Sequence, residues 1–264
     1  MLLQPERTLI QPEFGEREAW YRLARERGYG LELVSLAFPG IINDPETERA
    51  HVEAYAAELA DFGGRLTLHG PFVDVTPHSG DRRIAEASFS RIDDCLASAA
   101  RLGATHVVFH TGINYLIRNP GYMVRSAALQ AEFWRGALER FPGVTVCLEN
   151  VWEPGPEELR RILDAAAHPR LKVCFDVGHA HVFSRAPAEA WLDALGGDAV
   201  YLHLNDNHGD RDAELPLGRG NIEWDRVFRA VEGLPAAPLV VPEVATLPQV
   251  EECLAFLRAA GVLA

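Results

Sequence analysis

The chain has 264 residues, a length that suits one large domain or two small ones, and α/β barrels often reach it as a single domain. Hydrophobic residues make up 48% and charged residues 24%, and no apolar run reaches the roughly 18 residues that would indicate a membrane span. The net charge of −13 argues against a nucleic-acid partner, because the sequence shows no local basic patch to offset it.

The first residues show no basic stretch followed by an apolar segment, so we expect no secretion signal and a cytoplasmic protein without a membrane partner. The cysteines lie in apolar runs, form no CxxC pair and are expected to be reduced and buried: Cys95, Cys147, Cys174 and Cys253.

Short apolar runs rich in β-forming residues alternate with amphipathic segments along the chain. Strands are expected at residues 8–11, 31–36, 65–69, 105–110, 145–149, 171–176, 199–204 and 238–244. Apolar positions at helical spacing occur between them, most clearly at residues 46–63, 83–103, 156–167 and 247–261. This alternation is typical of βα units and a parallel sheet.

Eight βα units in one chain predict a (β/α)8 TIM barrel, an α/β fold that would occupy residues 1–264 as a single domain. The first strand, at residues 8–11, is short and weakly patterned, so whether it is complete stays open. The rival is an open doubly wound sheet, but no glycine-rich dinucleotide-binding turn follows any of the strands.

Six predicted strands have a histidine or an acidic residue as their last or next-to-last residue. In chain order these are His69, His110, Glu149, Asp176, His203 and Glu243. A TIM barrel gathers such strand ends in one mouth, where active sites lie. Each residue alone could be an ordinary hydrogen-bonding side chain, but the set together indicates a site, because a divalent cation would satisfy several buried charges at once.

Four of these residues form a mixed set of oxygen and nitrogen ligands: Glu149, Asp176, His203 and Glu243. Such a set suits Mn²⁺, Mg²⁺, Co²⁺ or Zn²⁺, and ligand types alone do not identify the element. The sequence therefore predicts a divalent metal cofactor.

The motifs at these strand ends resemble one known family. They are LHGPF (68–72), FHTG (109–112), CLEN (147–150), CFDVGHAH (174–181), HLND (203–206) and PEV (242–244). In this order they resemble the xylose-isomerase-like TIM-barrel superfamily, which includes sugar and sugar-phosphate isomerases and epimerases as well as AP endonucleases of family 2, the endonuclease IV type. The resemblance covers the chain from the second strand to the C-terminus.

The isomerase and epimerase branch implies one divalent metal held by Glu149, Asp176, His203 and Glu243. It also implies that Glu149 and Glu243 exchange a proton next to a carbonyl through a metal-stabilised enediolate. His179 would bind the substrate or tune the metal. The chain is thereby predicted to be a metal-dependent sugar or sugar-phosphate isomerase or epimerase.

The endonuclease branch implies a second function, a phosphoester hydrolase with two or three metal ions. Its further ligands match His69, His110, His179 and Asp212, but Glu214 stands where that branch has a histidine. The net charge of −13 favours a substrate other than DNA. A third alternative is a metal-binding or sugar-binding barrel without catalysis, and the presence of both Glu149 and Glu243 argues against it.

Other residues carry weaker hypotheses. Arg219 could contact a substrate phosphate, and Trp152 and Phe72 could form a wall on which a sugar stacks. Asp206, His208 and Asp210 are expected to be solvated loop residues, and His78 to face solvent or stand behind the site. The expected partner is a small molecule, a sugar or a phosphorylated compound, and a homo-oligomer is compatible with the sequence.

Overall fold

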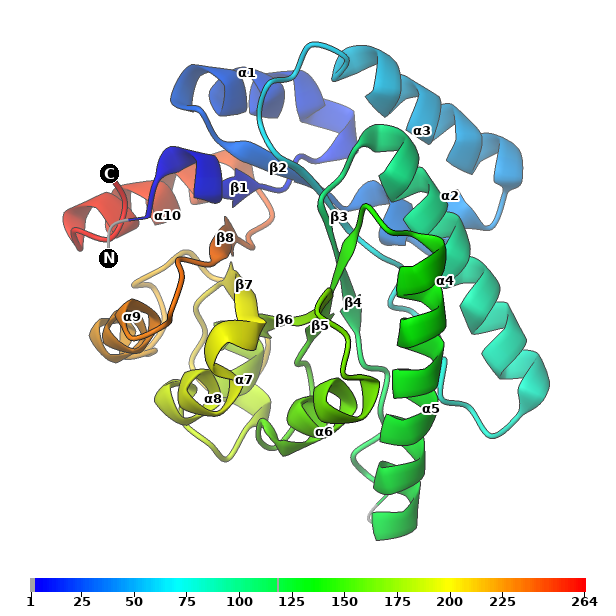
Figure 1. Ribbon diagram of the computed structural model, residues 1–264. Helices are drawn as coiled ribbons and strands as arrows, with labels where there is room; N and C mark the ends of the chain where they lie inside the picture. The colour runs from blue at the N-terminus through cyan, green and yellow to red at the C-terminus, as the bar shows by residue number, and fades with distance from the viewer. Residues whose placement is uncertain (1–2, 118) are drawn as a thin grey trace.

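The computed structural model describes residues 3–117 and 119–264. Eight parallel strands pair in sequence order to form a barrel, as predicted, with helices around its outside (Figure 1). The strands are β1 Leu9–Ile10, β2 Gly30–Leu33, β3 Leu66–His69, β4 His106–His110, β5 Thr145–Glu149, β6 Leu171–Asp176, β7 Ala199–Leu204 and β8 Leu239–Pro242. A single bridge between Thr8 and Val240 brings β1 against β8 and closes the barrel.

The helices around the barrel are α1 Arg17–Arg27, α2 Pro39–Ile42, α3 Pro45–Glu58, α4 Arg82–Leu102, α5 Pro120–Arg140, α6 Glu157–Ala166, α7 Val177–Phe183, α8 Ala188–Leu195, α9 Trp224–Glu232 and α10 Leu247–Ala259. Side chains of Asp44, Asp81 and Asn119 accept backbone N–H groups at the starts of α3, α4 and α5. Gly28 and Gly103 end α1 and α4 with positive φ, a conformation that glycine adopts without strain. The four helical segments predicted from apolar spacing are all present.

The inside of the barrel is filled by side chains from alternate strand positions. Its central cluster consists of Leu9, Val108, Cys147, Cys174, Tyr201, Leu239 and Val241. Because side chains alternate along a strand, the residues two positions further on from Cys147, Cys174, Tyr201 and Val241 emerge on the same side at the C-terminal end. Those residues are Glu149, Asp176, His203 and Glu243.

The strand at each edge of the closing seam is short. β1 has two residues, fewer than the four predicted, and β8 ends at Pro242, so Glu243 lies one residue beyond the strand. Glu243 is nevertheless fixed at the barrel end, because its backbone N–H donates to the Leu204 carbonyl at 3.0 Å.

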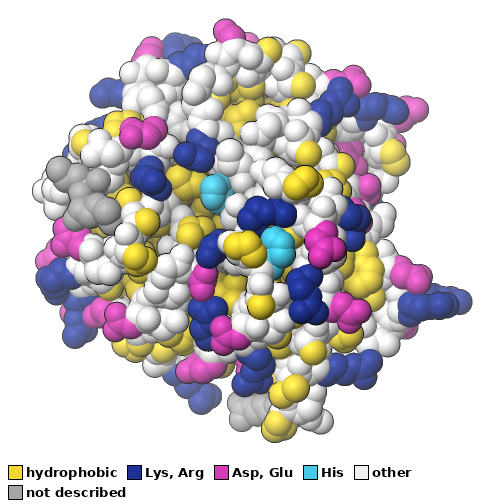
Figure 2. Space-filling view, viewed as in Figure 1, with side chains coloured by type: hydrophobic (Ala, Val, Ile, Leu, Met, Phe, Trp, Pro, Cys, Tyr) yellow, Lys and Arg dark blue, Asp and Glu magenta, His cyan; other side chains and the backbone are white. Residues whose placement is uncertain are grey.

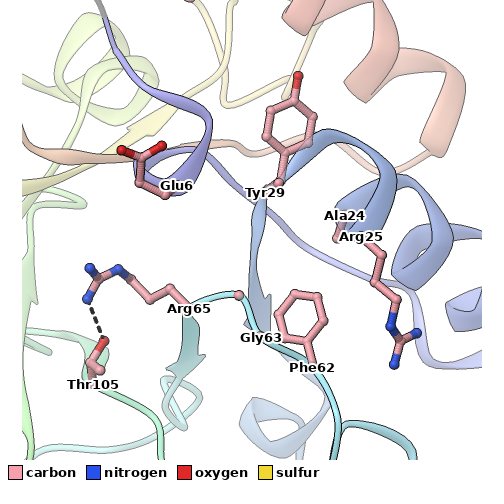
Figure 3. A pocket seen from close by; sticks show the side chains of 10 residues that line it. Glu6, Ala24, Arg25, Tyr29, Phe62, Gly63, Arg65 and Thr105 are labelled. Carbon is pink, nitrogen blue, oxygen red and sulfur yellow. Dashed lines mark hydrogen bonds between the residues drawn. The ribbon is translucent and has the colours of Figure 1, made fainter.

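The N-terminal end of the barrel has a hollow of its own, about 520 Å³, beside the starts of β2 and β3 (Figure 3). Arg65 lies in its wall and donates to the Thr105 hydroxyl at 3.3 Å. On the face shown in Figure 2, acidic and basic side chains are interspersed. Within the described residues, no helix combines the length and the hydropathy needed to cross a membrane.

Candidate metal and active site

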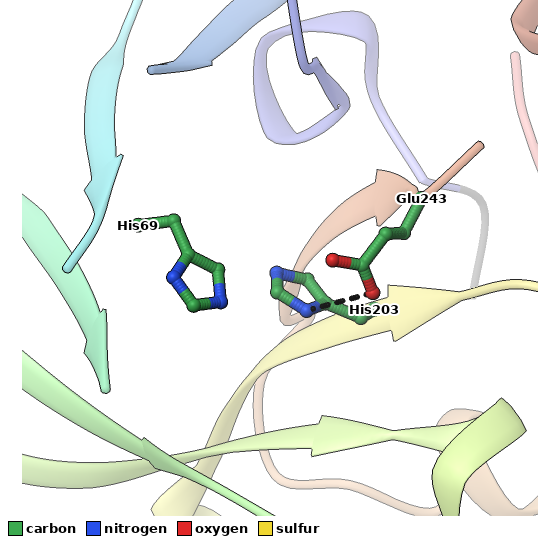
Figure 4. A group of neighbouring side chains, drawn as sticks. All are labelled: His69, His203 and Glu243. Carbon is green, nitrogen blue, oxygen red and sulfur yellow. Dashed lines mark ion pairs between the residues drawn. The ribbon is translucent and has the colours of Figure 1, made fainter. Parts of the chain in front are cut away.

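Six side chains predicted from the strand ends meet at the C-terminal mouth of the barrel. His69, His110, Glu149 and Asp176 are the last residues of β3 to β6, His203 is the penultimate residue of β7, and Glu243 follows β8. Strand register places His110 beside Glu149 and Asp176 beside His203. Figure 4 shows the His69 and His203 rings and the Glu243 carboxylate close together, although they come from distant parts of the chain.

The four candidate ligands predicted from the sequence are among the residues brought together. Glu149, Asp176, His203 and Glu243 each offer one ligand atom, and these atoms all lie within 4.8 Å of one another. His69, His110 and Glu149 form a second group that meets the same criterion. The buried cluster could therefore bind a metal ion, and Glu149 belongs to both groups.

Glu149 is buried and surrounded by imidazoles. Its Oε2 lies 3.2 Å from His69 Nε2 and 3.3 Å from His110 Nε2. Its Oε1 lies 3.2 Å from His203 Nδ1 and 3.3 Å from His179 Nδ1. Burial disfavours the charged form, but the surrounding histidines outweigh burial and hold the pKa of the Glu149 carboxyl well below its usual range.

Asp176 is buried in the same cluster as Glu149, but its pKa is shifted in the opposite direction. Its Oδ2 accepts from Asn205 Nδ2 at 3.2 Å, and the Asn150 side chain fixes its backbone through Nδ2 at 2.8 Å and Oδ1 at 2.9 Å. Burial, together with the nearby Glu243 and Glu149 carboxylates, raises the pKa of Asp176 well above its usual range. This carboxyl is therefore harder to ionise than an exposed aspartic acid.

His203 is fully buried between acids on both sides of its ring. Nδ1 lies 3.2 Å from Glu149 Oε1 and 3.3 Å from Glu243 Oε2, while Nε2 lies 3.2 Å from Glu32 Oε1. Burial alone would lower the pKa of His203, but the surrounding carboxylates raise it well above its usual range. A proton on this ring therefore offsets part of the negative charge in the cluster.

His179, Asp212 and Glu214 lie together on the rim of the mouth. His179 Nε2 lies 3.1 Å from Asp212 Oδ2, and its Nδ1 lies 2.9 Å from the Asn150 carbonyl. Glu214 has a positive φ of 43°, rare for a residue with a side chain. Partial burial and the neighbouring Glu243 and Asp212 charges raise the pKa of Glu214 to about 7.

A cavity of about 800 Å³ opens above this floor, large enough for a small-molecule ligand. Its wall includes the predicted residues His69, His110, His179, Asp212, Glu214, Glu243, Trp152 and Phe72. The Phe72 ring stacks on His110 with centroids 4.9 Å apart, and Trp152 is 54% exposed. Arg219 is not part of this wall, since its guanidinium forms an ion pair with Glu252 on α10.

The expectation that Asp206 is a solvated loop residue is wrong, and of the two alternatives for His78 the structure excludes the solvent-facing one. Asp206 is fully buried, because its carboxylate accepts from Gly218 N and from the Trp224 indole, both at 2.9 Å, and fixes the loop that follows β7. His78 is also buried, with Nδ1 3.3 Å from the Gln130 amide and Nε2 3.3 Å from the Tyr122 hydroxyl. Both residues stabilise loops at the mouth.

Sequence reasoning also missed Glu32. This glutamate lies inside β2, where its neighbours Leu31 and Leu33 are buried, and its own exposed fraction is 0%. The available signal was its position, because a charged residue within an apolar strand needs a partner inside the protein. That partner is His203.

The donor chemistry of the cluster fits a divalent cation. Three carboxyl groups and an imidazole converge in a buried space, and the pKa values of two of these carboxyl groups, Asp176 and Glu149, are shifted in opposite directions. Carboxylate and imidazole ligands are typical of Mn²⁺, Co²⁺ and Zn²⁺ sites.

Comparisons with known proteins agree with this architecture. The TTHB071 protein of Thermus thermophilus, whose structure is described as soaked with ZnCl₂, is 30% identical, with a TM-score of 0.78 over 96% of this chain and 97% of that one. A D-tagatose 3-epimerase-like protein has a TM-score of 0.77 over 96% of each chain at 21% identity, a likeness of fold.

A curated relative has no assigned function. The uncharacterized protein MJ1311 of Methanocaldococcus jannaschii is 29% identical over 195 residues, which span 67% of this chain and 64% of the relative, just under two thirds of its length. The sequence profile described as "Xylose isomerase-like TIM barrel" matches residues 22–260. The chain belongs to the xylose isomerase-like TIM-barrel family, whose structural neighbours include sugar epimerases.

Proposed function

We propose that the protein is a divalent-metal-dependent isomerase or epimerase of a small sugar, with residues 1–264 acting as one cytoplasmic barrel domain. The observation that carries the proposal is the group of Glu149, Asp176, His203 and Glu243, whose ligand atoms lie within 4.8 Å of one another beside the cavity. The family supports the same chemistry, since it includes sugar epimerases.

In this proposal the four residues hold the ion and two of them also move protons. When bound, a divalent ion supplies Lewis-acid polarisation of the substrate carbonyl and stabilises negative charge on its oxygen. Glu243, on the cavity wall, takes the proton from the carbon next to the carbonyl, and the electrons of that C–H bond form the C=C bond of an enediolate.

Glu149 returns a proton from the floor of the cavity. It is 1% exposed, and His69, whose pKa is raised by its contact with Glu149, is the neighbour that can pass it a proton. Delivery to the opposite face of the same carbon gives the epimer, and delivery to the neighbouring carbon gives the isomer. The placement of one glutamate on the wall and the other on the floor supports proton transfer from two directions.

The composition of the cavity wall favours an uncharged sugar over a sugar phosphate. Glu13, Asp74, Asp212, Glu214 and Glu243 all line it, and none of the described residues in this wall is Lys or Arg. A phosphate group would therefore meet negative charge without the guanidinium or ammonium partner that usually binds it. Aromatic side chains, Phe72 and Trp152, offer a face on which a sugar ring can stack.

The test is solvent hydrogen exchange. Metal-loaded protein is incubated in D₂O with a panel of ketoses and ketose phosphates, and deuterium at the carbons next to the carbonyl is followed by NMR. We expect exchange and epimer formation with at least one unphosphorylated ketose, and none with metal-free protein. Absence of exchange across the panel contradicts the proposal.

The phosphoester hydrolase is kept as a second candidate because of the way Glu149 divides its contacts. Oε2 faces His69 and His110, while Oε1 faces His203 and His179, so Glu149 could contribute to two separate groups of ligands that would hold metal ions. Clustered ions suit hydrolysis, since they activate water and stabilise the leaving oxygen. Elemental analysis separates the candidates: one ion per chain supports the isomerase, and two or three with activity on phosphoesters support the hydrolase.

A further inference from the structure

We propose that Glu32 is a positioning residue that sets which nitrogen of His203 faces the candidate ligands and, through Gln11, holds the Glu243 carboxylate. Glu32 is buried on β2, and its contacts reach both residues. The inference rests on the metal role proposed above and extends the site to a residue behind it.

Three donors converge on the two oxygens of Glu32. Gln11 Nε2 donates to Oε1 at 2.6 Å, the Tyr201 hydroxyl donates to Oε2, and His203 Nε2 lies 3.2 Å from Oε1 and 3.3 Å from Oε2. The Tyr201 hydroxyl is itself 2.8 Å from the Thr67 hydroxyl. An ionised carboxylate can accept from all of these donors at once.

This arrangement fixes the tautomer of the His203 ring. Glu32 accepts hydrogen bonds, so when Glu149 and Glu243 bind a cation the proton of the neutral ring belongs on Nε2. Nδ1 then carries the lone pair, and it is the nitrogen that lies 3.2 Å from Glu149 Oε1 and 3.3 Å from Glu243 Oε2. A metal ligand requires this tautomer, and an acceptor on the far nitrogen is the usual means of holding it.

Gln11 connects Glu32 to Glu243, a second candidate ligand. The same Nε2 that donates to Glu32 lies 3.4 Å from Glu243 Oε1. Gln11 follows β1 and Glu243 follows β8, so the network crosses the seam where the short first strand meets the last. Closure of the barrel and the placement of His203 and Glu243 are thereby linked.

Stability alone does not explain a glutamate at this position. The central cluster of the barrel interior is mostly apolar, with Leu9, Val108 and Val241 among its members. Replacing a buried ionic network by well-packed apolar residues is often neutral or stabilising. The orientation of His203 supplies the reason for a charge here.

The test is Glu32→Gln in the full chain. The amide has one acceptor oxygen, and its NH₂ group would face one of the three donors, so the His203 ring can be driven to accept on Nε2 and carry its proton on Nδ1. We expect the affinity for Zn²⁺ and for Mn²⁺, measured by chelator competition, to fall about 10–100-fold. ¹⁵N NMR of the histidine rings, recorded at a pH high enough to make His203 neutral, should show a corresponding rise in the Nδ1–H tautomer of His203.

Glu153→Gln is the matched control. Glu153 is also a buried carboxylate, 2% exposed, and accepts from Val151 N at 2.6 Å and from Tyr115 at 3.4 Å. We expect this variant to lose stability while its metal affinity stays within about twofold of wild type. A loss of affinity as large as that of Glu32→Gln would assign the effect to general destabilisation and overturn the inference.

Gln11→Met keeps the inference testable if Glu32→Gln does not fold, because Gln11 lies at the partly exposed mouth. We expect a smaller loss of metal affinity through Glu243 alone. Wild-type affinity in every folded variant overturns the role of Glu32 and leaves the proposed function intact. A wild-type chain that binds neither ion would overturn both.

Discussion

The two ends of the barrel hold their charged residues in opposite ways. At the N-terminal end, Arg170 donates to the carbonyl oxygens of Phe141 and Val144 at 2.9 and 2.6 Å, and Lys172 lies 2.6 Å from Asp198. At the C-terminal end, three carboxyl groups crowd within 4.8 Å around His203, and further acids stand at the rim.

This difference between the two ends distinguishes residues that stabilise the fold from residues that form the candidate site. Arg170 and Lys172 at the N-terminal end have acceptors supplied by the chain, so they are satisfied by folding alone. The carboxyl groups at the C-terminal end repel one another, and their charges help to raise the pKa values of His203 and Asp176. Mutations at the N-terminal end should therefore change mainly the stability of the fold, and mutations at the C-terminal end should change mainly the proposed activity.

The largest effect is expected for Glu243→Gln at the C-terminal end. The amide keeps the shape of the side chain but cannot take a proton, so the rate of hydrogen exchange into a ketose substrate should fall about 10²–10⁴-fold. NMR in D₂O measures this rate. Glu251→Gln, an exposed substitution on α10, is the control and should leave the rate unchanged. An equal rate in Glu243→Gln would remove Glu243 from the proton transfer.

The next effect concerns stability at the N-terminal end. Arg170→Ala removes the guanidinium that donates to Phe141 and Val144, leaving these carbonyls without that donor, and should lower the free energy of unfolding by about 3 kcal/mol. Denaturant unfolding measures the loss. Metal affinity in this variant should equal that of wild type, and a change in it would show that the two ends are coupled.

The contrast between the ends also explains what the sequence could predict. Strands two to eight were predictable from their apolar runs, and the six mouth residues were predictable because strands three to eight each carry a polar residue at the C-terminal end, where barrel geometry gathers them. The two-residue β1 was not bounded correctly, since so short a strand has no measurable periodicity. Glu32 and Asp206 were missed because their partners, His203 and Trp224, are brought to them by the fold.

The number of metal ions was not predictable for a related reason. The number of ions that the site could hold depends on which oxygen of Glu149 faces which histidine. His110 contacts Oε2, whereas His179 contacts Oε1. Side-chain direction of this kind is set by packing around the buried carboxylate and leaves no trace in residue spacing. The candidate ligands were therefore accessible from the sequence, whereas the way they group around Glu149 required the structure.

A smaller effect is expected when the pH is changed, and it concerns the metal affinity of the C-terminal end. The pKa of His203 is raised well above its usual value, so the metal-free ring holds its proton more tightly than an ordinary histidine, and a metal ion must displace the Nδ1 proton. Affinity should rise about tenfold per pH unit for each proton released while the pH is below the folded pKa. Calorimetry at two pH values, in buffers of different ionisation enthalpy, measures affinity and proton release together.

The His203 proton also stabilises the metal-free fold. This stabilisation decreases as the pH rises, whereas the metal affinity increases. Because the folded pKa of His203 lies above the unfolded one, this stabilisation is complete below the unfolded pKa and is lost as pH rises through the folded pKa. Metal-free protein should lose this contribution toward alkaline pH, while metal-loaded protein should not. Affinity that is independent of pH, without proton release, would mean that His203 does not exchange a proton for a metal ion.

The smallest effect is expected at the rim, for the double variant Asp212→Asn and Glu214→Gln. If a single ion is held by Glu149, Asp176, His203 and Glu243, these changes remove one partly exposed hydrogen bond to His179 and should lower kcat/KM by about fivefold. The ion count by elemental analysis should stay at one per chain. In a multinuclear hydrolase the same variant would lose an ion that Asp212 or Glu214 helps to bind, so a fall in the count would favour hydrolysis over isomerisation. The double variant thus tests whether the acidic residues at this end of the barrel bind one cation or several.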